Sequence, residues 1–140
     1  MKLYLDTNVI LDMLDPERTE ADSTAILFDL ARKKRIELVV STQSIIDSYY
    51  IGGNLGITKD VMDRLMKWIL DYLNVRAIDS IDMRQAMNMV FPDIEDNAQI
   101  AMADNAGCDF FITKDMEVLT QHTESLCVFT TPGGFIKRLT

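Results

Sequence analysis

The stretch Lys2-Leu3-Tyr4-Leu5-Asp6-Thr7-Asn8 decides the fold of this 140-residue chain. Its apolar centre and charged ends predict a short buried strand over residues 2–6. Four more segments read as strands, namely 36–40, 75–78, 109–113 and the pair Val128-Phe129. Segments of helical periodicity separate them, and strands that alternate with helices indicate βαβ units. We therefore predict an α/β fold with three α/β/α layers and a mostly parallel five-stranded sheet.

The segments between the strands carry the helical signals. Apolar residues recur at helical spacing over 20–34, 58–72 and 81–90. Ser41 or Thr42 can cap a helix that runs to Tyr50 and that should stop at Gly52-Gly53-Asn54. The remaining expected helices are 95–106, a short one near Asp115, and a closing turn or helix over 132–139.

The composition is that of one ordinary globular domain over residues 1–140, with 48% hydrophobic and 26% charged residues. No apolar run is long enough for a membrane span, and an early charge at Asp6 argues against a signal peptide. Cys108 and Cys127 stand in no CxxC pair, so we expect core thiols and a cytoplasmic protein. The 14 basic and 22 acidic residues give a net charge of −8, which excludes nucleic-acid binding by a basic surface.

Carboxylates follow the ends of the predicted strands, where open α/β sheets bind their ligands. Asp6 ends the first strand, and Asp115 follows the fourth. Asp47 lies in a mostly apolar helix, so we expect it to be partly buried. Carboxylates that converge without basic partners repel one another, and Mg²⁺ or Mn²⁺ with oxygen ligands resolves that repulsion.

Each acidic residue also has a purely structural interpretation. Asp6 and Asp115 could cap the helices that follow them, and Asp93 could cap the helix at Glu95. The only role of Asp96 would then be a favourable interaction of its carboxylate with the helix dipole in the first turn.

Three further features lead to expectations outside the site. His122, the single histidine, lies in a polar stretch and should be a solvated surface residue. Met62 and Met66 form a second apolar stripe on the 58–72 helix, which should be exposed and become buried in a dimer or under a partner helix. Asp12 lies outside the proposed acidic site, so its replacement by Asn should neither raise the metal-free Tm nor flatten the response of Tm to Mg²⁺.

Four stretches in order resemble the PIN-domain ribonucleases: residues 4–12, 41–47, 95–101 and 108–115. The resemblance implies a parallel sheet of order 3-2-1-4-5, which places the first and fourth strands side by side. It maps the acidic site onto Asp6, Asp47, Asp96 and Asp115, with Asn8, Thr113 and Asp93 in support.

The resemblance also implies an activity. Such a protein is a Mg²⁺- or Mn²⁺-dependent endoribonuclease that cleaves single-stranded RNA, and its metal ligands here would be Asp6, Asp96 and Asp115. Many small bacterial members are toxins of VapC type, so we expect an antitoxin partner and a homodimer.

Two alternatives remain at this stage. The second acidic position of the family is more often Glu, and Asp47 is one methylene shorter, which favours a non-catalytic, partner-binding module of the same fold. A phosphohydrolase with Asp6 as its nucleophile would need a cation after a later strand, and Lys114 could supply it. That class also needs a second Asp where Asn8 stands.

Overall fold

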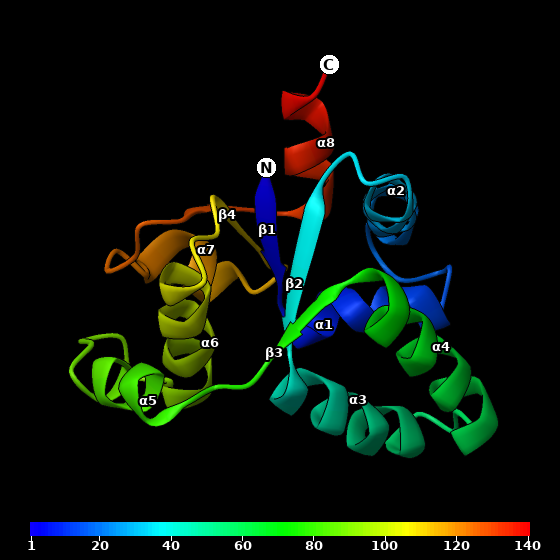
Figure 1. Ribbon diagram of the computed structural model, residues 1–140, viewed down its shortest axis with the longest axis horizontal. Coiled ribbons are helices and arrows are strands. Elements are labelled where there is room, and N and C mark those ends of the chain that lie inside the picture. The colour runs from blue at the N-terminus through cyan, green and yellow to red at the C-terminus, as the bar shows by residue number, and fades with distance from the viewer.

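The structure is a computed structural model that describes all residues, 1–140. Five parallel strands form one sheet in the order β3-β2-β1-β4-β5, which Figure 1 shows at the centre of the molecule. The strands are β1 (Lys2–Leu5), β2 (Glu37–Ser41), β3 (Asn74–Arg76), β4 (Phe110–Ile112) and β5 (Val128–Thr130). The predicted fold class and strand order are confirmed, and β1 lies directly between β2 and β4.

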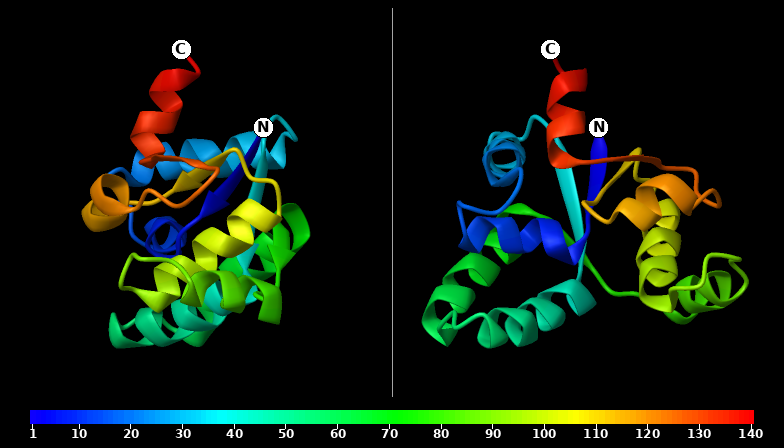
Figure 2. Two further views of the ribbon diagram at one scale, coloured as in Figure 1. Left: turned by 90° about the vertical axis from the view of Figure 1, so that its left-hand side faces the viewer. Right: turned by 180° about the vertical axis from the view of Figure 1, so that it is seen from behind.

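Helices cover both faces of the sheet. They are α1 (Thr7–Ile10), the 3₁₀ turn η1 (Leu11–Leu14), α2 (Ala21–Arg32), α3 (Thr42–Asn54), α4 (Lys59–Tyr72), α5 (Ser80–Met87), α6 (Ile94–Asn105), α7 (Met116–Gln121) and α8 (Pro132–Arg138). Figures 1 and 2 show α5, α6 and α7 on one side and the other helices on the opposite side. None of these helices is both long and apolar enough to cross a membrane.

The alternation of side chains along β1 divides the core into two clusters. Leu3 and Leu5 pack with the α2, α4 and α8 side chains, whereas Tyr4 packs on the α6 side. The Tyr4 ring stacks on Phe111 of β4 with 5.0 Å between the ring centroids. Because successive strand residues face opposite ways, a strand buried on both faces must be apolar throughout, as β1 is.

Helix α3 runs through the two glycines at which the sequence predicts a stop. It continues to Asn54, and Gly56 follows with a φ of +83°. Gly52 faces α4, where an added Cβ would lie only 2.1 Å from Cε of Met62. The glycine therefore allows α3 and α4 to approach closely, and it does not end the helix.

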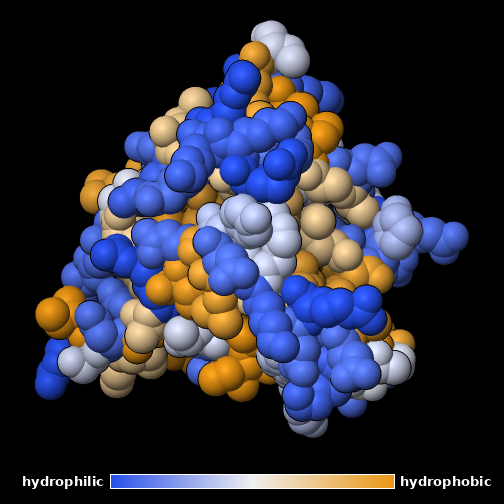
Figure 3. Space-filling model, turned by 45° about the vertical axis from the view of Figure 1, so that its right-hand side comes forward, coloured by the Kyte–Doolittle hydropathy of each residue, from blue (hydrophilic) through white to orange (hydrophobic).

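The expectation of an exposed methionine stripe is wrong. Met62 and Met66 are each 2% exposed and belong to the larger core cluster, with Met62 against Gly52. On the face shown in Figure 3, hydrophobic residues form small separate patches among hydrophilic ones. This stripe therefore gives no support for a partner-binding surface.

The helix expected over 81–90 is shorter, and its far end faces solvent while Ala86 is buried. Helix α5 ends at Met87, which is 72% exposed, and Val90 lies beyond it and is 88% exposed. The core contact comes instead from Phe91, which is buried in the α6-side cluster. The stretch 81–90 thus consists of a short helix and the start of a loop that Phe91 anchors.

His122 is buried and not a surface residue. Its Nε2 lies 3.1 Å from Oδ1 of Asn97, and its ring packs against Phe91 and Phe129. Asn97 in turn donates to the Phe91 carbonyl at 2.6 Å, so this pair fixes the loop before α6. Burial lowers the pKa of His122. The polar residues next to His122 in the sequence do not reveal its burial, because its hydrogen-bond partner Asn97 lies 25 residues away in the chain.

Candidate active site

An acidic hollow of about 300 Å³ lies at the carboxyl edge of the sheet. Figure 1 shows α3 below the strand ends and α6 beside them. The lining residues are Asp6, Thr7, Asn8, Asp47, Tyr50, Ile51, Glu95, Asp96, Gln99 and Asp115. All four predicted acidic residues are among them, and no Lys or Arg is. The hollow lies where the strand order reverses between β1 and β4, the usual ligand position in such sheets.

Asp6 is the most buried carboxylate of the hollow, with an exposed fraction of 5%. It caps α1 by accepting a hydrogen bond from the Thr7 amide at 2.7 Å. Its other oxygen accepts from the Thr113 hydroxyl at 2.8 Å. Burial raises the pKa of Asp6, and the hydrogen bonds from Thr113 and Thr7 partly offset that effect. Asp6 is thus held in place by neutral donors and has no cation beside it.

Thr113 connects the ends of β1 and β4. The residue is fully buried, and its hydroxyl oxygen accepts from the Asp115 amide at 3.0 Å while it donates to Asp6. Asp115 caps α7 by accepting from the Glu117 amide at 2.9 Å. One threonine therefore sets the positions of both strand-end carboxylates relative to each other.

Asp96 enters the hollow from the first turn of α6. Asp93 caps this helix and accepts from the Asp96 amide at 3.1 Å. Burial raises the pKa of Asp96 to about 7, and the negative charges of Asp93, Asp6 and Asp115 add to the rise. The cap predicted for Asp93 is confirmed. Burial is thus the main cause of the raised pKa of Asp96, and the neighbouring carboxylates add to it.

Asp47 and Asn8 complete the predicted set. Asp47 is half-buried on α3, as expected, and accepts a hydrogen bond from Nε2 of Gln43 at 2.9 Å. Asn8 is exposed at the rim, where its carbonyl accepts from Arg18 at 3.1 Å. The structure therefore places all the predicted residues at or next to one hollow, although they come from four separate segments.

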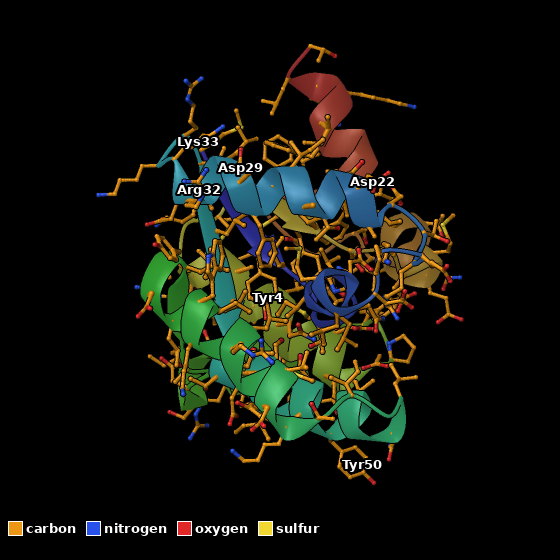
Figure 4. The ribbon with its side chains drawn as sticks, turned by 90° about the vertical axis from the view of Figure 1, so that its right-hand side faces the viewer. Tyr4, Asp22, Asp29, Arg32, Lys33 and Tyr50 are labelled. Carbon is orange, nitrogen blue, oxygen red and sulfur yellow. The ribbon has the colours of Figure 1, made fainter.

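A polar network below the hollow was missed by sequence reasoning. Gln99 accepts hydrogen bonds from the Tyr4 hydroxyl at 3.0 Å and the Ser44 hydroxyl at 3.3 Å. Ser44 also accepts from the Thr7 hydroxyl at 2.8 Å. Figure 4 shows Tyr4 in the interior of the molecule. The available signal was the spacing of Gln99 and Asp96, which are three residues apart and so share one face of α6.

The donor set suits a hard divalent cation. It consists of carboxylate oxygens with neutral hydrogen-bond donors behind them and no competing Lys or Arg in the lining. No three of the acidic side chains are arranged to ligate one ion directly. Mg²⁺ commonly takes only one or two protein carboxylates and completes its shell with water and substrate oxygens. The residues of the hollow fit that mode of binding.

Asp12 belongs to a different and closed arrangement. Its side chain is fully buried and accepts from Arg18 Nε at 2.9 Å and Thr24 Oγ1 at 2.7 Å, and Lys114 Nζ also contacts it. Asp12 is therefore part of a buried ion-pair network, so its replacement by Asn should lower stability, which agrees with the expectation that this change does not raise Tm. Because Lys114 is engaged with Asp12 and with the Thr19 carbonyl, it is not free to serve Asp6 as a phosphohydrolase cation.

Comparison with known proteins identifies a similar sequence and similar solved structures. The chain is 25% identical over 138 residues to ribonuclease VapC1 of Aquifex aeolicus (strain VF5), covering 90% of this chain and 93% of that protein. Among solved structures, VapBC2 of Rickettsia felis, bound to a DNA fragment from its promoter, matches with a TM-score of 0.70 and 13% identity over 94% of this chain and 98% of that chain.

A second solved structure has the same fold. VapC20 of Mycobacterium tuberculosis, described as a sarcin–ricin loop cleaving toxin, matches with a TM-score of 0.66 and 11% identity, covering 82% of this chain and 91% of that chain. The sequence also matches the family described as "PIN domain" over residues 2–117. That stretch contains every strand-end carboxylate of the hollow, and the chain belongs to the PIN domain family.

Proposed function

We propose that the chain is an endoribonuclease that cleaves single-stranded RNA at the acidic hollow with the help of Mg²⁺ or Mn²⁺. The observation that carries the proposal is the convergence of Asp6, Asp47, Asp96 and Asp115 on one hollow whose lining contains no cation. The relatives support it, because one is named a ribonuclease and another is described as a sarcin–ricin loop cleaving toxin.

Asp6, Asp96 and Asp115 would hold the metal ion, directly or through water. A divalent ion bound there would supply positive charge for the scissile phosphate and would lower the pKa of a bound water. Thr113 and the Thr7 amide fix the carboxylate of Asp6, so its orientation costs little when a ligand arrives. The metal ion would thereby supply, at the site itself, the positive charge that a protein with a net charge of −8 lacks on its surface.

Asp47 would act on the attacking water. It faces the strand-end carboxylates from α3, and its carboxylate is already oriented by Gln43. From that side it can accept the proton of a water molecule that lies in the hollow. Its shorter side chain, compared with Glu, is accommodated if such contacts run through water.

The direct test is cleavage of a labelled single-stranded RNA by the purified protein. We expect cleavage with Mg²⁺ or Mn²⁺ and none in EDTA. Asp6→Asn and Asp96→Asn should each lower kcat/KM by roughly 10²–10³-fold, since a ligand charge is lost while the shape is kept. Asp22→Asn is the matched control. Figure 4 shows Asp22 on α2, at the opposite end of the view from Tyr50, which lines the hollow.

The outcome also separates the alternatives. Equal cleavage in EDTA would exclude the metal-dependent mechanism. Absence of cleavage under all conditions, in a folded protein, would leave the non-catalytic binding module as the better hypothesis.

We further propose that the chain is the toxin of a toxin–antitoxin pair, acting on cytoplasmic RNA as a homodimer. The support is the likeness to VapC proteins, one of which was solved as VapBC2. Expression should arrest growth, Asp6→Asn should remove the arrest, and a short neighbouring reading frame should encode a protein that co-purifies. Light scattering on the purified chain tests the dimer, and a monomeric mass at micromolar concentration would contradict it.

A further inference from the structure

An apolar pocket of about 280 Å³ adjoins the acidic hollow. Its apolar wall comes from the segment after β3, from α5 and from α6, and consists of Ile78, Met83, Ile94 and Ala98. Figure 2 shows α5 and α6 in front of the sheet in its left-hand view. Met83 and Ile94 are 36% and 45% exposed, so their side chains are accessible to a ligand without unfolding any element.

The pocket and the hollow are continuous. Both are lined by Asp47, Glu95 and Gln99, which thus form the boundary between them. A polymer with one phosphate in the hollow can therefore place a neighbouring unit along this boundary. The neighbouring unit of an RNA strand is a nucleotide, whose base is flat, aromatic and largely apolar on its faces.

The charge distribution favours contacts to bases over contacts to phosphates. Neither lining contains a Lys or an Arg, and the cations near the hollow, Arg18 and Lys114, are engaged with Asp12. Phosphate contacts, which supply much of the affinity in basic nucleic-acid-binding proteins, therefore contribute little here. Binding energy beyond that of a metal ion must come from surfaces that accept bases.

We propose that the apolar pocket binds a nucleobase of the RNA next to the phosphate in the hollow; this rests on the proposed function. Its size lies just below the roughly 300–1,000 Å³ of ordinary ligand pockets, which suits one ring system and not a helix. The Met83 thioether and the Ile94 side chain provide the contacts, since methionine sulfur packs favourably on aromatic rings. The exposed amide of Gln43 at the rim can read a base edge.

The kinetic test compares two methionines of one helix. Met83→Ala, alone and together with Ile94→Ala, should raise KM for single-stranded RNA by about 5- to 10-fold and leave kcat within about 2-fold, because base contacts remote from the phosphate act as uniform binding. Met87→Ala removes an exposed methionine one turn along α5 and outside the pocket, and it should change neither constant. If KM is unchanged in the double variant while the wild type still cleaves RNA, the base-pocket proposal is wrong and the proposed nuclease function is unaffected.

A second measurement does not depend on cleavage. In protein with ¹³C-labelled methionine methyl groups, the four ribonucleoside 5′-monophosphates with Mg²⁺ should shift the Met83 resonance upfield, because a base over the methyl group exerts a ring current. Ribose 5-phosphate, which has no base, should not shift it, and Met87 should stay unmoved with either ligand. Absence of a Met83 shift at saturating nucleotide overturns the proposal.

The two measurements also separate this inference from the proposed function. A Met83 shift in a protein that never cleaves RNA supports the base pocket and contradicts the nuclease. If Met83→Ala weakens the binding of a co-purifying protein while KM and the nucleotide shifts stay unchanged, the pocket is a protein-docking site and the base proposal is wrong.

Discussion

Asp6 and Asp12 are two buried carboxylates that lie six residues apart and have opposite surroundings. Asp12 is neutralised by Arg18 and Lys114 and receives a third hydrogen bond from Thr24. Asp6 receives hydrogen bonds from neutral donors and shares its hollow with other carboxylates. Burial alone therefore does not distinguish a structural acid from a functional one. The distinction lies in whether a cation of the protein already occupies the space in front of the carboxylate.

The same comparison explains why the cations are not at the proposed site. Lys114 lies directly between Thr113 and Asp115 in the sequence, yet its ammonium group points to Asp12 and to the Thr19 carbonyl. The protein thus removes its own positive charge from the hollow. An external cation can then occupy the acidic site without a competitor.

The largest expected effect concerns activity at Asp6. Asp6→Asn should reduce RNA cleavage by roughly 10²–10³-fold while the protein stays folded, because the substitution removes charge where charge is needed for the metal ion. Cleavage assays with matched melting curves measure it. The Asp12→Asn variant, tested at a temperature where it is folded, should retain most of the cleavage activity. An equal loss of activity in both variants would contradict the distinction between Asp6 as a functional carboxylate and Asp12 as a structural one.

The same two substitutions should have the opposite ranking for stability, with the larger loss in Asp12→Asn. Asp12→Asn leaves two cations without their partner and should lower the free energy of unfolding by about 2–4 kcal/mol. Urea denaturation in the absence of metal measures this. Asp6→Asn should instead keep or increase that free energy, since repulsion from Asp115 and Asp96 is relieved. A stable Asp12→Asn protein would show that the ion pairs contribute no net stability.

Metal addition should stabilise the wild type. For a Kd near ~1 mM, roughly 10 mM Mg²⁺ adds about 1.4 kcal/mol to the folded state. In a domain of this size that raises Tm by about 3–6 °C. Mg²⁺ should not raise the Tm of Asp6→Asn, and it should raise the Tm of Asp22→Asn as much as that of the wild type. A wild type that does not respond to Mg²⁺ or Mn²⁺ would favour the non-catalytic module.

The smallest effect is a pH dependence through Asp96. Its pKa of about 7 in the folded state exceeds the unfolded value of about 3.9, so the folded state holds a proton that the unfolded state has released. The metal-free protein should therefore lose stability as pH rises from about 4 to about 7, by about 1 kcal/mol once solvent screening of this half-exposed group is included.

Asp96→Asn is the variant that checks this pH dependence. Because Asn does not titrate, melting curves of the variant between pH 4 and 8 should lack this component of the slope. Identical slopes in the two proteins would mean that Asp96 has an ordinary pKa and that the hollow is better solvated than its burial indicates.

Much of the architecture follows from the sequence. The apolar run before Asp6, and the strand-like segments ending at Ser41 and near Thr113, are buried on both faces, so composition alone marks them as strands of a parallel sheet. The placement of Asp6 and Asp115 at the ends of β1 and β4 follows in turn, because parallel strands end at a common edge.

The errors share one cause. The sequence predicts a helix stop at Gly52 and exposure of Met62, and both predictions are wrong because these two residues contact each other across α3 and α4. The predicted solvation of His122 is wrong because Asn97, its hydrogen-bond partner, lies 25 residues away in the chain. Periodicity describes a residue relative to its own helix or strand and contains no information about which element packs against it.

The order of the elements, the acidic residues at the strand ends and the excess of negative charge are all read directly from the amino-acid chain. Which carboxylates are neutralised and which face the hollow depends on the packing of separate elements. Lys114 reaches Asp12 across 102 residues, and Gln99 reaches Tyr4 across 95. Such contacts depend on how separate elements pack, because hydrogen bonds and ion pairs act over a few ångströms in space whatever the separation along the chain.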